Sequence, residues 1–419
     1  MQANEIELGA VITDIAAGPF GSNLKVSSFV DSGFPIIDGA NLKGYKVTDN
    51  ITKFVTEEKA RSLHRSIAHR GDVVVTISGT VGQISYIPED SQYSEYLCSQ
   101  RQFRATFDTS RVYVPYLVFY FHTYEGQHKI LSFANQTGVP ALAQPLKNFR
   151  QIRLRLPEFM EQRKIASVIE KINDKIEKNE AINHNLQQQI QTLYSSWFCA
   201  YEPFGGVVPD DWSTKTLADI ADFIGGYAYK GSELRESSTA MATIKNFDRG
   251  GGFKLDGYKE IQPSDKLKDT QKIELFDLLV AHTDLTQNAE VIGNAEMVMS
   301  LSKFQDAIFS MDLVKVIPKH NNISRFFLAA ILQNRYFKAH CLGYVNGTTV
   351  LHLSKKALPE YELLLPDDFS ILRPFDEAVT ALYLQISANI CENNRLELLR
   401  DTLLPKLMSG EIDVSEVEV

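Results

Sequence analysis

The glycine-rich segment GYAYKGSE (226–233) is the part of the sequence that comes nearest to a site for nucleotide phosphates. Its glycines have a suitable spacing, but Ser232 and Glu233 stand where a phosphate-binding loop requires a lysine followed by serine or threonine. Without that lysine the phosphates would lack a counter-charge, and the carboxylate of Glu233 would repel them. We therefore do not expect a nucleotide to bind here.

Motifs for catalysis are also missing from the sequence. The nine histidines form no H-E-x-x-H pair or other metal-binding spacing, and no G-x-S-x-G segment marks a nucleophilic serine. No glycine-rich loop suited to S-adenosylmethionine follows an expected strand. We therefore expect no catalytic residue, no metal site and no cofactor on this chain.

Polar and basic side chains in loops form a second kind of candidate, because base edges are read by hydrogen-bonding groups and phosphates attract lysine and arginine. In the first half of the chain, three loops carry such side chains. They are Ser22, Asn23 and Lys25; Lys43 and Tyr45; and Gln136 and Thr137.

The run KNFRQIRLR (147–155) alternates polar and apolar residues, which predicts a strand. One face of this strand would carry Lys147, Gln151, Arg153 and Arg155. Such a row of positive charge fits the backbone of a nucleic acid. A solvated face near the edge of a sheet explains the pattern equally well.

Matching candidates occur in the second half of the chain, without an equivalent row of arginines. They are Tyr227, Tyr229 and Lys230; Lys245 and Asn246; and Asn346, Thr348, Thr349 and His352. The neighbouring glycines at positions 226, 231 and 347 fit turns as well as they fit a close approach to a ligand.

These loops must be positioned by larger elements, and the clearest of these is a helix expected over residues 158–198. Apolar residues recur there in steps of four and three, which is the pattern of a heptad seam. The segment contains no glycine, and Pro157 stands at its expected start. The seam consists of Ile165, Ile169, Ile172, Ile176, Asn179, Asn183, Leu186, Ile190, Leu193 and Trp197.

The same seam returns 210 residues later. It consists of Phe375, Val379, Leu382, Ile386, Asn389, Asn393, Leu396, Arg400, Leu403 and Leu407. Both asparagines recur in phase, whereas Arg400 does not fit. A buried asparagine in a seam sets the register, because a shifted partner leaves its amide without a hydrogen bond. We therefore expect the two helices to pack on each other with Asn179 and Asn183 facing Asn389 and Asn393, rather than each helix covering only its own module.

The segments between the helices repeat more faintly. NQTGVPAL (135–142) aligns with NGTTVLHL (346–353), and GDVVVTIS (71–78) aligns with FDLLVAHT (276–283). Each module combines short strands with one shorter helix, expected near 115–131 and 324–340. The sequence thus predicts an α+β protein with two mixed modules and two long helices. We expect module 1 at 1–157, its helix at 158–198, module 2 at 199–366, its helix at 367–410 and a tail at 411–419.

The net charge of −9 does not exclude a nucleic-acid partner, because its distribution is uneven. Residues 367–419 hold 11 acidic and 4 basic side chains, whereas residues 1–157 hold 14 acidic and 16 basic ones. The sequence has no apolar run long enough to span a membrane and no basic segment of a secretory signal at its start. Four cysteines without C-x-x-C pairing favour the cytoplasm.

Five segments, taken in order together with the duplication, resemble the specificity subunit of type I restriction–modification enzymes over essentially the whole chain. They are AGPFGSNLK (17–25), EQRKIA (161–166), VVPDDWSTKTLADI (207–220), GGYAYKGSEL (225–234) and LLPKLMSGEI (403–412). Each is short and degenerate alone, but the set is specific. Arg400 and the strong difference between the two modules are the departures from the family pattern.

This resemblance implies two target-recognition domains, held apart by antiparallel helices, that read the halves of a bipartite site in double-stranded DNA. It also implies that two methyltransferase subunits and the restriction–translocase subunits dock on the chain. S-adenosylmethionine, ATP and Mg²⁺ are then expected on those partners. The N/D-P-P-Y/F motif of adenine methylation is absent from this sequence, which fits a non-catalytic subunit.

The repeat also suggests a geometry, because antiparallel helices relate the modules by a pseudo-two-fold axis. A helix of about 41 residues is about 60 Å long at 1.5 Å per residue. Half-sites on one face of DNA lie about 34–36 Å apart, or one helical turn. We therefore expect helix length to set the unread spacer of an asymmetric site. The alternative is a coiled-coil scaffold for proteins without DNA sequence specificity.

Overall fold

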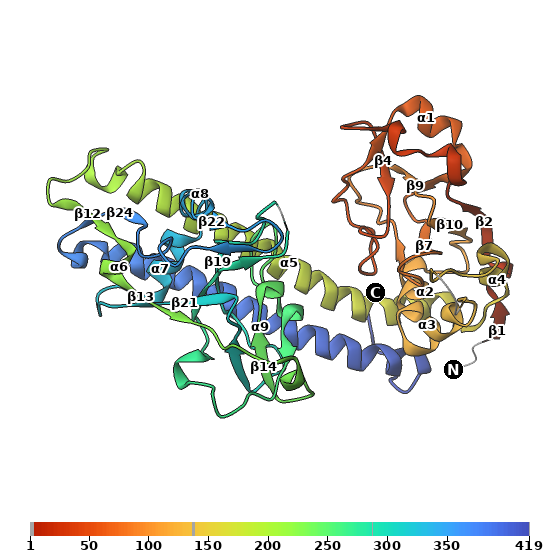
Figure 1. Cartoon of the computed structure of the whole chain (residues 1–419). Helices are drawn as coiled ribbons and strands as arrows, with labels where there is room; N and C mark the ends of the chain where they lie inside the picture. Colours follow the sequence, from red (N-terminus) through yellow and green to blue (C-terminus); the bar gives the residue numbers. More distant parts are fainter. Residues whose placement is uncertain (1–3, 136–138, 287, 419) are drawn as a thin grey trace. The chain divides into compact units, whose positions relative to one another are not determined.

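The computed structural model describes residues 4–135, 139–286 and 288–418. The chain forms two compact units, and each long helix contributes to both of them. Unit 1 contains Met1–Asp174 and Leu396–Val419, and unit 2 contains Lys175–Arg395. Figure 1 shows the course of the chain. No helix in the described part of the chain is both long and apolar enough to cross a membrane.

Unit 1 contains module 1, whose central sheet has the antiparallel strand order β2-β10-β7-β8. A second sheet has the order β3-β5-β4-β9-β6, with β4 and β9 parallel, and β1 pairs with β11. The strands are β1 (Asn4–Glu7), β2 (Ile12–Ala17), β3 (Phe29–Val30), β4 (Phe34–Ile37), β5 (Phe54–Val55), β6 (Ile67–His69), β7 (Val73–Thr76), β8 (Ile84–Tyr86), β9 (Glu95–Cys98), β10 (Gln102–Phe107) and β11 (Arg153–Leu156). The short helices are α1 (Glu57–Ser62), α2 (Val114–Phe121), α3 (Tyr124–Leu131) and α4 (Pro145–Gln151).

Unit 2 contains module 2, which repeats this topology. Its central sheet has the order β13-β21-β17-β19, and its second sheet, β15-β14-β20-β16, has β14 and β20 parallel. β12 pairs with β24, and β18, β23 and β22 form a further small sheet. The strands are β12 (Trp212–Thr216), β13 (Ala221–Gly225), β14 (Thr239–Ala242), β15 (Lys259–Glu260), β16 (Lys272–Ile273), β17 (Leu278–Ala281), β18 (Thr283–Asp284), β19 (Ala295–Met297), β20 (Asp306–Phe309), β21 (Leu313–Pro318), β22 (Val345–Asn346), β23 (Leu351–Leu353) and β24 (Glu362–Pro366). The short helices are α6 (Leu217–Ile220), α7 (Arg325–Leu332) and α8 (Arg335–Leu342).

The β-bridges of the two modules match residue by residue. Ser78 bridges Ala141 in module 1, and Thr283 bridges His352 in module 2. Ala134 bridges Leu142, and Val345 bridges Leu353 in the same way. The faint alignments of 71–78 with 276–283 and of 135–142 with 346–353 therefore identify segments that are equivalent in the fold. The predicted duplication is confirmed.

Two predictions about local structure were wrong. Near 115–131 and 324–340 two short helices stand where one was expected, α2 and α3 in module 1 and α7 and α8 in module 2, because Thr123 and Asn334 end the first helix by capping the second. Oγ1 of Thr123 accepts the N–H of Gly126 at 3.1 Å, and Oδ1 of Asn334 accepts the N–H of Tyr336 at 2.8 Å. The run 147–155 is also divided, since residues 145–151 form α4 and only 153–156 form a strand.

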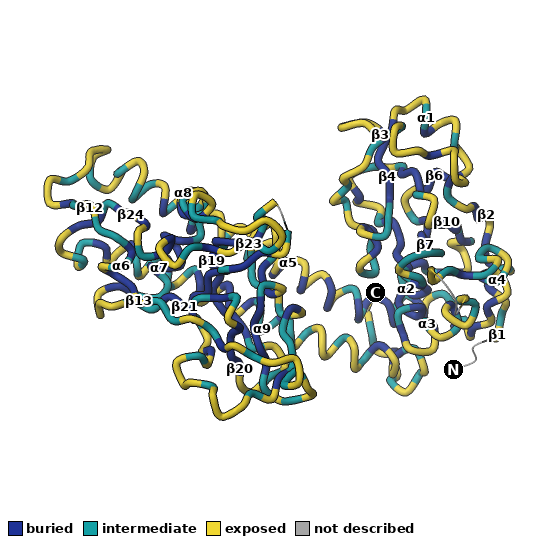
Figure 2. The backbone as a smooth tube through the Cα atoms, viewed as in Figure 1, coloured by how far each residue is buried: buried dark blue, intermediate teal, exposed yellow. Residues whose placement is uncertain are grey.

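The two long helices are α5 (Phe159–Phe198) and α9 (Arg373–Ser409), and they pack together within each unit (Figure 1). In unit 2 the rings of Trp197 and Phe375 lie 5.6 Å apart. In unit 1 Ile165 and Ile169 share a buried cluster with Leu404 and Leu407. The start of one helix thus meets the end of the other, so the pairing is antiparallel, as expected. Figure 2 shows the dark, buried faces of both helices.

The asparagines of the seam lie opposite each other within unit 2. Nδ2 of Asn179 donates to Oδ1 of Asn393 at 2.8 Å, and Nδ2 of Asn389 donates to Oδ1 of Asn183 at 2.8 Å. Asn179 also donates to the carboxylate of Glu392 at 2.7 Å. Asn179 is only 1% exposed, and its Oδ1 has no hydrogen-bond partner within the described chain. A polar layer therefore interrupts the apolar seam of the helix pair.

Candidate nucleic-acid interface

The first candidate site is a groove in module 1 with a volume of about 730 Å³. We call it groove 1. Loops on either side of β4 and β7, and the turn between β9 and β10, form its walls. Its lining residues include Leu24, Val26, Asp38, Lys43, Lys53, Thr76, Ser78, Gln83, Gln100, Arg101 and Gln102.

The loop that carries Ser22, Asn23 and Lys25 is held at the rim of groove 1. Nε2 of Gln100 donates to the carbonyl oxygens of Gly21 at 2.8 Å and of Leu24 at 2.5 Å. The three candidate side chains are exposed, as is the neighbouring ring of Phe20, which has 89% of its surface accessible. The loop therefore presents both polar groups and an aromatic side chain to a partner.

Glycine is required where this loop begins in both modules. A Cβ on Gly18 would lie 1.8 Å from the carbonyl oxygen of Ser99, and one on Gly226 would lie 2.0 Å from that of Ser310. Both distances are too short for any side chain. These glycines therefore serve the close approach of two backbone segments at equivalent positions in the two modules.

Lys43 is exposed on the wall of groove 1, whereas Tyr45 is not available there. The ring of Tyr45 packs between Phe119, at 4.7 Å, and His122, at 4.4 Å between centroids. The guanidinium of Arg400 covers it at 5.5 Å. The interpretation of Tyr45 as a base-reading residue is therefore corrected, because its ring joins the module to the helix pair of unit 1.

The expected row of basic side chains after position 147 is also corrected. Arg153 lies opposite Glu7 in the register of β1 and β11, and the two form an ion pair at 3.0 Å. Arg155 lies opposite Glu5. The glutamates of β1 therefore offset the positive charge of this strand, which fits a solvated sheet edge better than a contact with phosphates.

Arg101 is a residue of groove 1 that the sequence analysis missed. It is exposed in the turn between β9 and β10, and its guanidinium makes no ion pair with any residue that the structure describes. Thr76 and Gln83 lie nearby, joined by a hydrogen bond of 3.1 Å. The polar run Ser99–Gln102 between two buried strands was the available signal.

Gln136 and Thr137 lie outside the described residues. The segment that follows them is tied to groove 1, because the N–H of Gly79 donates to the carbonyl oxygen of Pro140 at 3.0 Å. The bridge between Ser78 and Ala141 lies in the same place.

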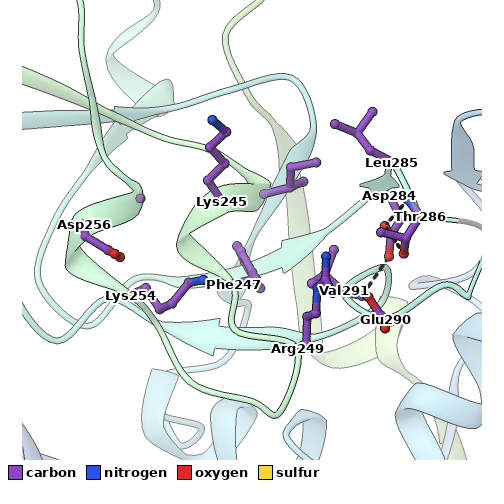
Figure 3. A pocket seen from close by; sticks show the side chains of 12 residues that line it. Lys245, Phe247, Arg249, Lys254, Asp256, Asp284, Leu285, Thr286, Glu290 and Val291 are labelled. Carbon is purple, nitrogen blue, oxygen red and sulfur yellow. Dashed lines mark hydrogen bonds and ion pairs between the residues drawn. The ribbon is translucent and has the colours of Figure 1, made fainter. Parts of the chain in front are cut away.

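The corresponding hollow of module 2, which we call groove 2, has a volume of about 340 Å³ (Figure 3). It lies between the loop that follows β14 and the loop that follows β18. Lys245, Arg249 and Lys254 surround it, and the sequence analysis named only the first of them. Arg249 forms an ion pair with Glu290 at 3.0 Å, and Lys254 forms one with Asp248 at 3.7 Å.

A buried asparagine shapes the loop beside each groove. The N–H of Asp38 donates to Oδ1 of Asn41 at 3.0 Å, and the N–H of Thr243 donates to Oδ1 of Asn246 at 2.9 Å. Asn246 is therefore a structural residue, which corrects its interpretation as a candidate contact. The same arrangement in both modules indicates that groove 1 and groove 2 lie beside equivalent loops.

Tyr227 must also be removed from the candidates. It is 3% exposed, and its hydroxyl donates to Oε1 of Glu233 at 2.7 Å. The N–H of Lys230 and then the hydroxyl of Tyr227 lower the pKa of Glu233 to about 2. Tyr229 packs half-buried in the same cluster, whereas Lys230 is exposed. The carboxylate of Glu233 thus organises this loop from within.

The remaining candidates of module 2 lie on a tight hairpin between β22 and β23. Asn346, Thr348, Thr349 and His352 are all exposed there. Gly347 adopts a φ of +107°, and a Cβ at this position would lie 2.2 Å from the carbonyl oxygen of Val350. The hairpin therefore needs glycine for its turn and presents polar side chains along its outer edge.

No cluster of histidine, cysteine, aspartate or glutamate suited to a metal ion occurs among the described residues.

Comparison with known proteins identifies the family. The model of the type I restriction modification DNA specificity domain matches residues 26–188 and again residues 209–391. The chain is 22% identical to the type I restriction enzyme MjaIX specificity subunit of Methanocaldococcus jannaschii, over 97% of this chain and 93% of that one. It is 24% identical to the type I restriction enzyme HindI specificity subunit of Haemophilus influenzae, over 62% of this chain and 69% of that one.

The fold is also that of a solved protein. The crystal structure of the S subunit of a type I restriction–modification system from M. genitalium matches with a TM-score of 0.57 and 14% sequence identity. The match covers 97% of this chain and 96% of that one. Since the two family matches span both modules and most of the helix pair, the chain belongs to the specificity subunits of type I restriction–modification systems, which are non-catalytic subunits.

Proposed function

We propose that this chain reads a bipartite, asymmetric site in double-stranded DNA, with one half-site read by each module. The observation that carries the proposal is a pair of grooves that lie beside equivalent loops of the two modules. Both lie beside a loop organised by a buried asparagine, Asn41 or Asn246, yet the side chains that line them differ. A conserved frame with different lining residues is what two unlike half-sites would require.

We assign the contacts to the exposed side chains around the grooves. For the first half-site these are Ser22, Asn23, Lys25 and Lys43, with Arg101 added from the structure. Gln136 and Thr137, which lie outside the described residues, stay candidates on the sequence alone. For the second they are Lys230, Lys245, Asn346, Thr348, Thr349 and His352. The lysines suit phosphates, whereas the amides, hydroxyls and Arg101 suit base edges, since an arginine can bind guanine through two hydrogen bonds.

The helix pair would scaffold the other subunits of the complex. Ile182, Leu384, Leu398 and Leu399 of α5 and α9 are exposed apolar residues, and such residues are typical of surfaces that a partner covers. We propose two methyltransferase subunits and the restriction–translocase subunits as these partners. S-adenosylmethionine, ATP and Mg²⁺ would then bind to them.

The test is to express the chain with its methyltransferase partner and to map methylated adenines across a genome. The expected result is one asymmetric motif of two short half-sites with an unread spacer. Exchange of module 2 for that of another specificity subunit should change one half-site only. Methylation without a sequence motif, or no retention of DNA at all, would favour the alternative of a coiled-coil scaffold without sequence specificity.

A further inference from the structure

In each module, one side chain holds the loop beside the groove by hydrogen bonds. It comes from α3 in module 1 and from α8 in module 2. In module 1, Nε2 of Gln127 donates to the carbonyl oxygen of Gly82 at 3.1 Å and to that of Phe121 at 2.7 Å. In module 2, Nζ of Lys338 donates to the carbonyl oxygens of Ala289, Glu290 and Ile292 and to Oδ1 of Asn294, at distances from 2.5 to 3.2 Å. Both residues are half-buried in the same turn of equivalent helices, α3 and α8.

The loops that these two residues hold are equivalent as well. Gly82 and Gly293 lie 211 positions apart, as do Gln127 and Lys338, and both glycines have a positive φ, of +89° and +76°. A Cβ on Gly82 would approach Oε1 of Gln127 to 3.0 Å, and one on Gly293 would approach Cβ of Cys341 to 2.5 Å. Each loop therefore lies directly against its helix at this point.

The two loops differ in length, and the side chains that hold them, Gln127 and Lys338, differ as well. Residues 77–83 connect β7 to β8 in module 1, whereas residues 282–294 separate β17 from β19 in module 2. In the longer loop several carbonyl oxygens converge on one point. An ammonium group has three N–H donors, which the three carbonyl oxygens and Oδ1 of Asn294 share, whereas an amide offers two.

The longer loop is held from its other side by Asp284. This buried carboxylate accepts the N–H groups of Thr286 at 2.8 Å, of Val291 at 2.7 Å and of Ile292 at 3.2 Å. Asp284 and Lys338 together fix the described part of the loop, residues 284–286 and 288–294. This part includes Leu285, which is 66% exposed on the wall of groove 2 (Figure 3).

We propose that Lys338 is a positioning residue that holds residues 284–286 and 288–294 in the conformation in which module 2 reads its half-site, and that Gln127 does the same for residues 77–83 of module 1. The inference rests on the proposed function. Because glutamine occupies this position in module 1, the fold by itself does not require a lysine here. The lysine instead accompanies the longer loop of module 2. The loop and the residue that holds it therefore differ together between the two modules, and together they contribute to the specificity of each module.

The test uses the complete complex with its methyltransferase partner and DNA probes in which one half-site at a time carries a mismatch. We expect Lys338→Met to lower discrimination at the second half-site about tenfold or more while leaving the first unchanged. Gln127→Leu should have the reciprocal effect, so each variant serves as the matched control of the other. A defect in the assembly of the complex would weaken binding to both half-sites together.

Equal loss at both half-sites, or no loss at either, would overturn the inference. If Lys338→Met prevents folding, the variant Lys338→Gln tests the inference instead. It introduces the glutamine that module 1 has at this position and keeps two N–H donors. We expect this variant to lose part of the discrimination at the second half-site only. A wild-type complex without two distinct half-sites would instead refute the proposed function itself.

Discussion

The guanidinium of Arg400 lies over the ring of Tyr45, with 5.5 Å between its central carbon and the ring centroid. This contact explains why an arginine stands in the heptad seam. Nη1 of Arg400 also donates to Oδ1 of the buried Asn173 at 3.3 Å, and its Nε pairs with Asp401 at 2.9 Å. At this layer of unit 1, α9 therefore contacts module 1 as well as α5.

Replacing Arg400 should destabilise unit 1 even though leucine would complete the apolar seam. We expect Arg400→Leu to lower the free energy of unfolding by about 1–2 kcal/mol, since it removes a cation–π contact and leaves the amide of Asn173 without this donor. Denaturant unfolding of the wild type, of the two single variants Arg400→Leu and Tyr45→Leu and of the double variant would measure the coupling. An Arg400→Leu variant as stable as the wild type would contradict this account.

The polar layer of the helix pair should respond differently to single and double substitutions. Asn393→Leu alone removes the acceptor of a hydrogen bond from buried Asn179, which we expect to cost about 1–3 kcal/mol. The double variant Asn179→Leu with Asn393→Leu should recover most of this loss, because two apolar residues can replace a buried polar pair. The free energies of unfolding of the wild type and of these two variants would decide. A double variant less stable than Asn393→Leu would refute the expected recovery of stability.

The stability of unit 2 should depend on pH through Glu296. Burial of this carboxyl raises its pKa to about 7, although the N–H of Gly252 donates to it at 2.7 Å. The folded state then binds more protons than the unfolded state between about pH 4.5 and 7. The free energy of unfolding should therefore fall as the pH rises through this range, by on the order of 3 kcal/mol in total.

Glu296→Gln should remove this fall, because an amide does not titrate. Thermal unfolding between pH 5 and pH 8 would compare the two proteins. We expect the wild type to lose stability relative to the variant towards pH 8. Parallel curves for the two proteins would show that the carboxyl does not titrate in this range.

Arg101 and Arg153 distinguish the groove from the sheet edge as the DNA-binding surface of module 1. We expect Arg101→Ala to weaken specific binding by about 1–3 kcal/mol and to relax the preference at one base of the first half-site. Arg153→Ala should leave binding unchanged, because the arginine already pairs with Glu7. Fluorescence anisotropy with the assembled complex would measure both. If both variants weakened DNA binding equally, the strand that carries Arg153 would contact DNA phosphates after all.

Helix length should set the spacer between the half-sites. Insertion of four residues in both α5 and α9 lengthens each helix by about 6 Å, and we expect the preferred spacer to shift by about one or two base pairs, given about 3.4 Å of DNA per base pair. Methylation mapping of the altered complex would reveal the new spacer. An unchanged spacer would mean that the helices do not act as a ruler.

The sequence alone determined the duplication and the helix pair. Heptad spacing follows directly from helical geometry, and the repeated asparagines, such as Asn179 and Asn389, could be recognised by their separation of 210 residues. The exposed loop residues Ser22, Lys43 and Lys245 could likewise be found, because polar residues between apolar strands are typical of loops.

Only the tertiary structure decided which of the polar and aromatic residues are free to meet a partner. Tyr45 and Tyr227 are packed inside, Arg153 is paired across a strand, and Arg101 lies free in a groove. Each of these outcomes depends on contacts between residues far apart in the chain, such as Arg400 with Tyr45 and Arg153 with Glu7. Spacing along the sequence carries no information on such pairs, because it reports periodicity within one element and not which elements meet.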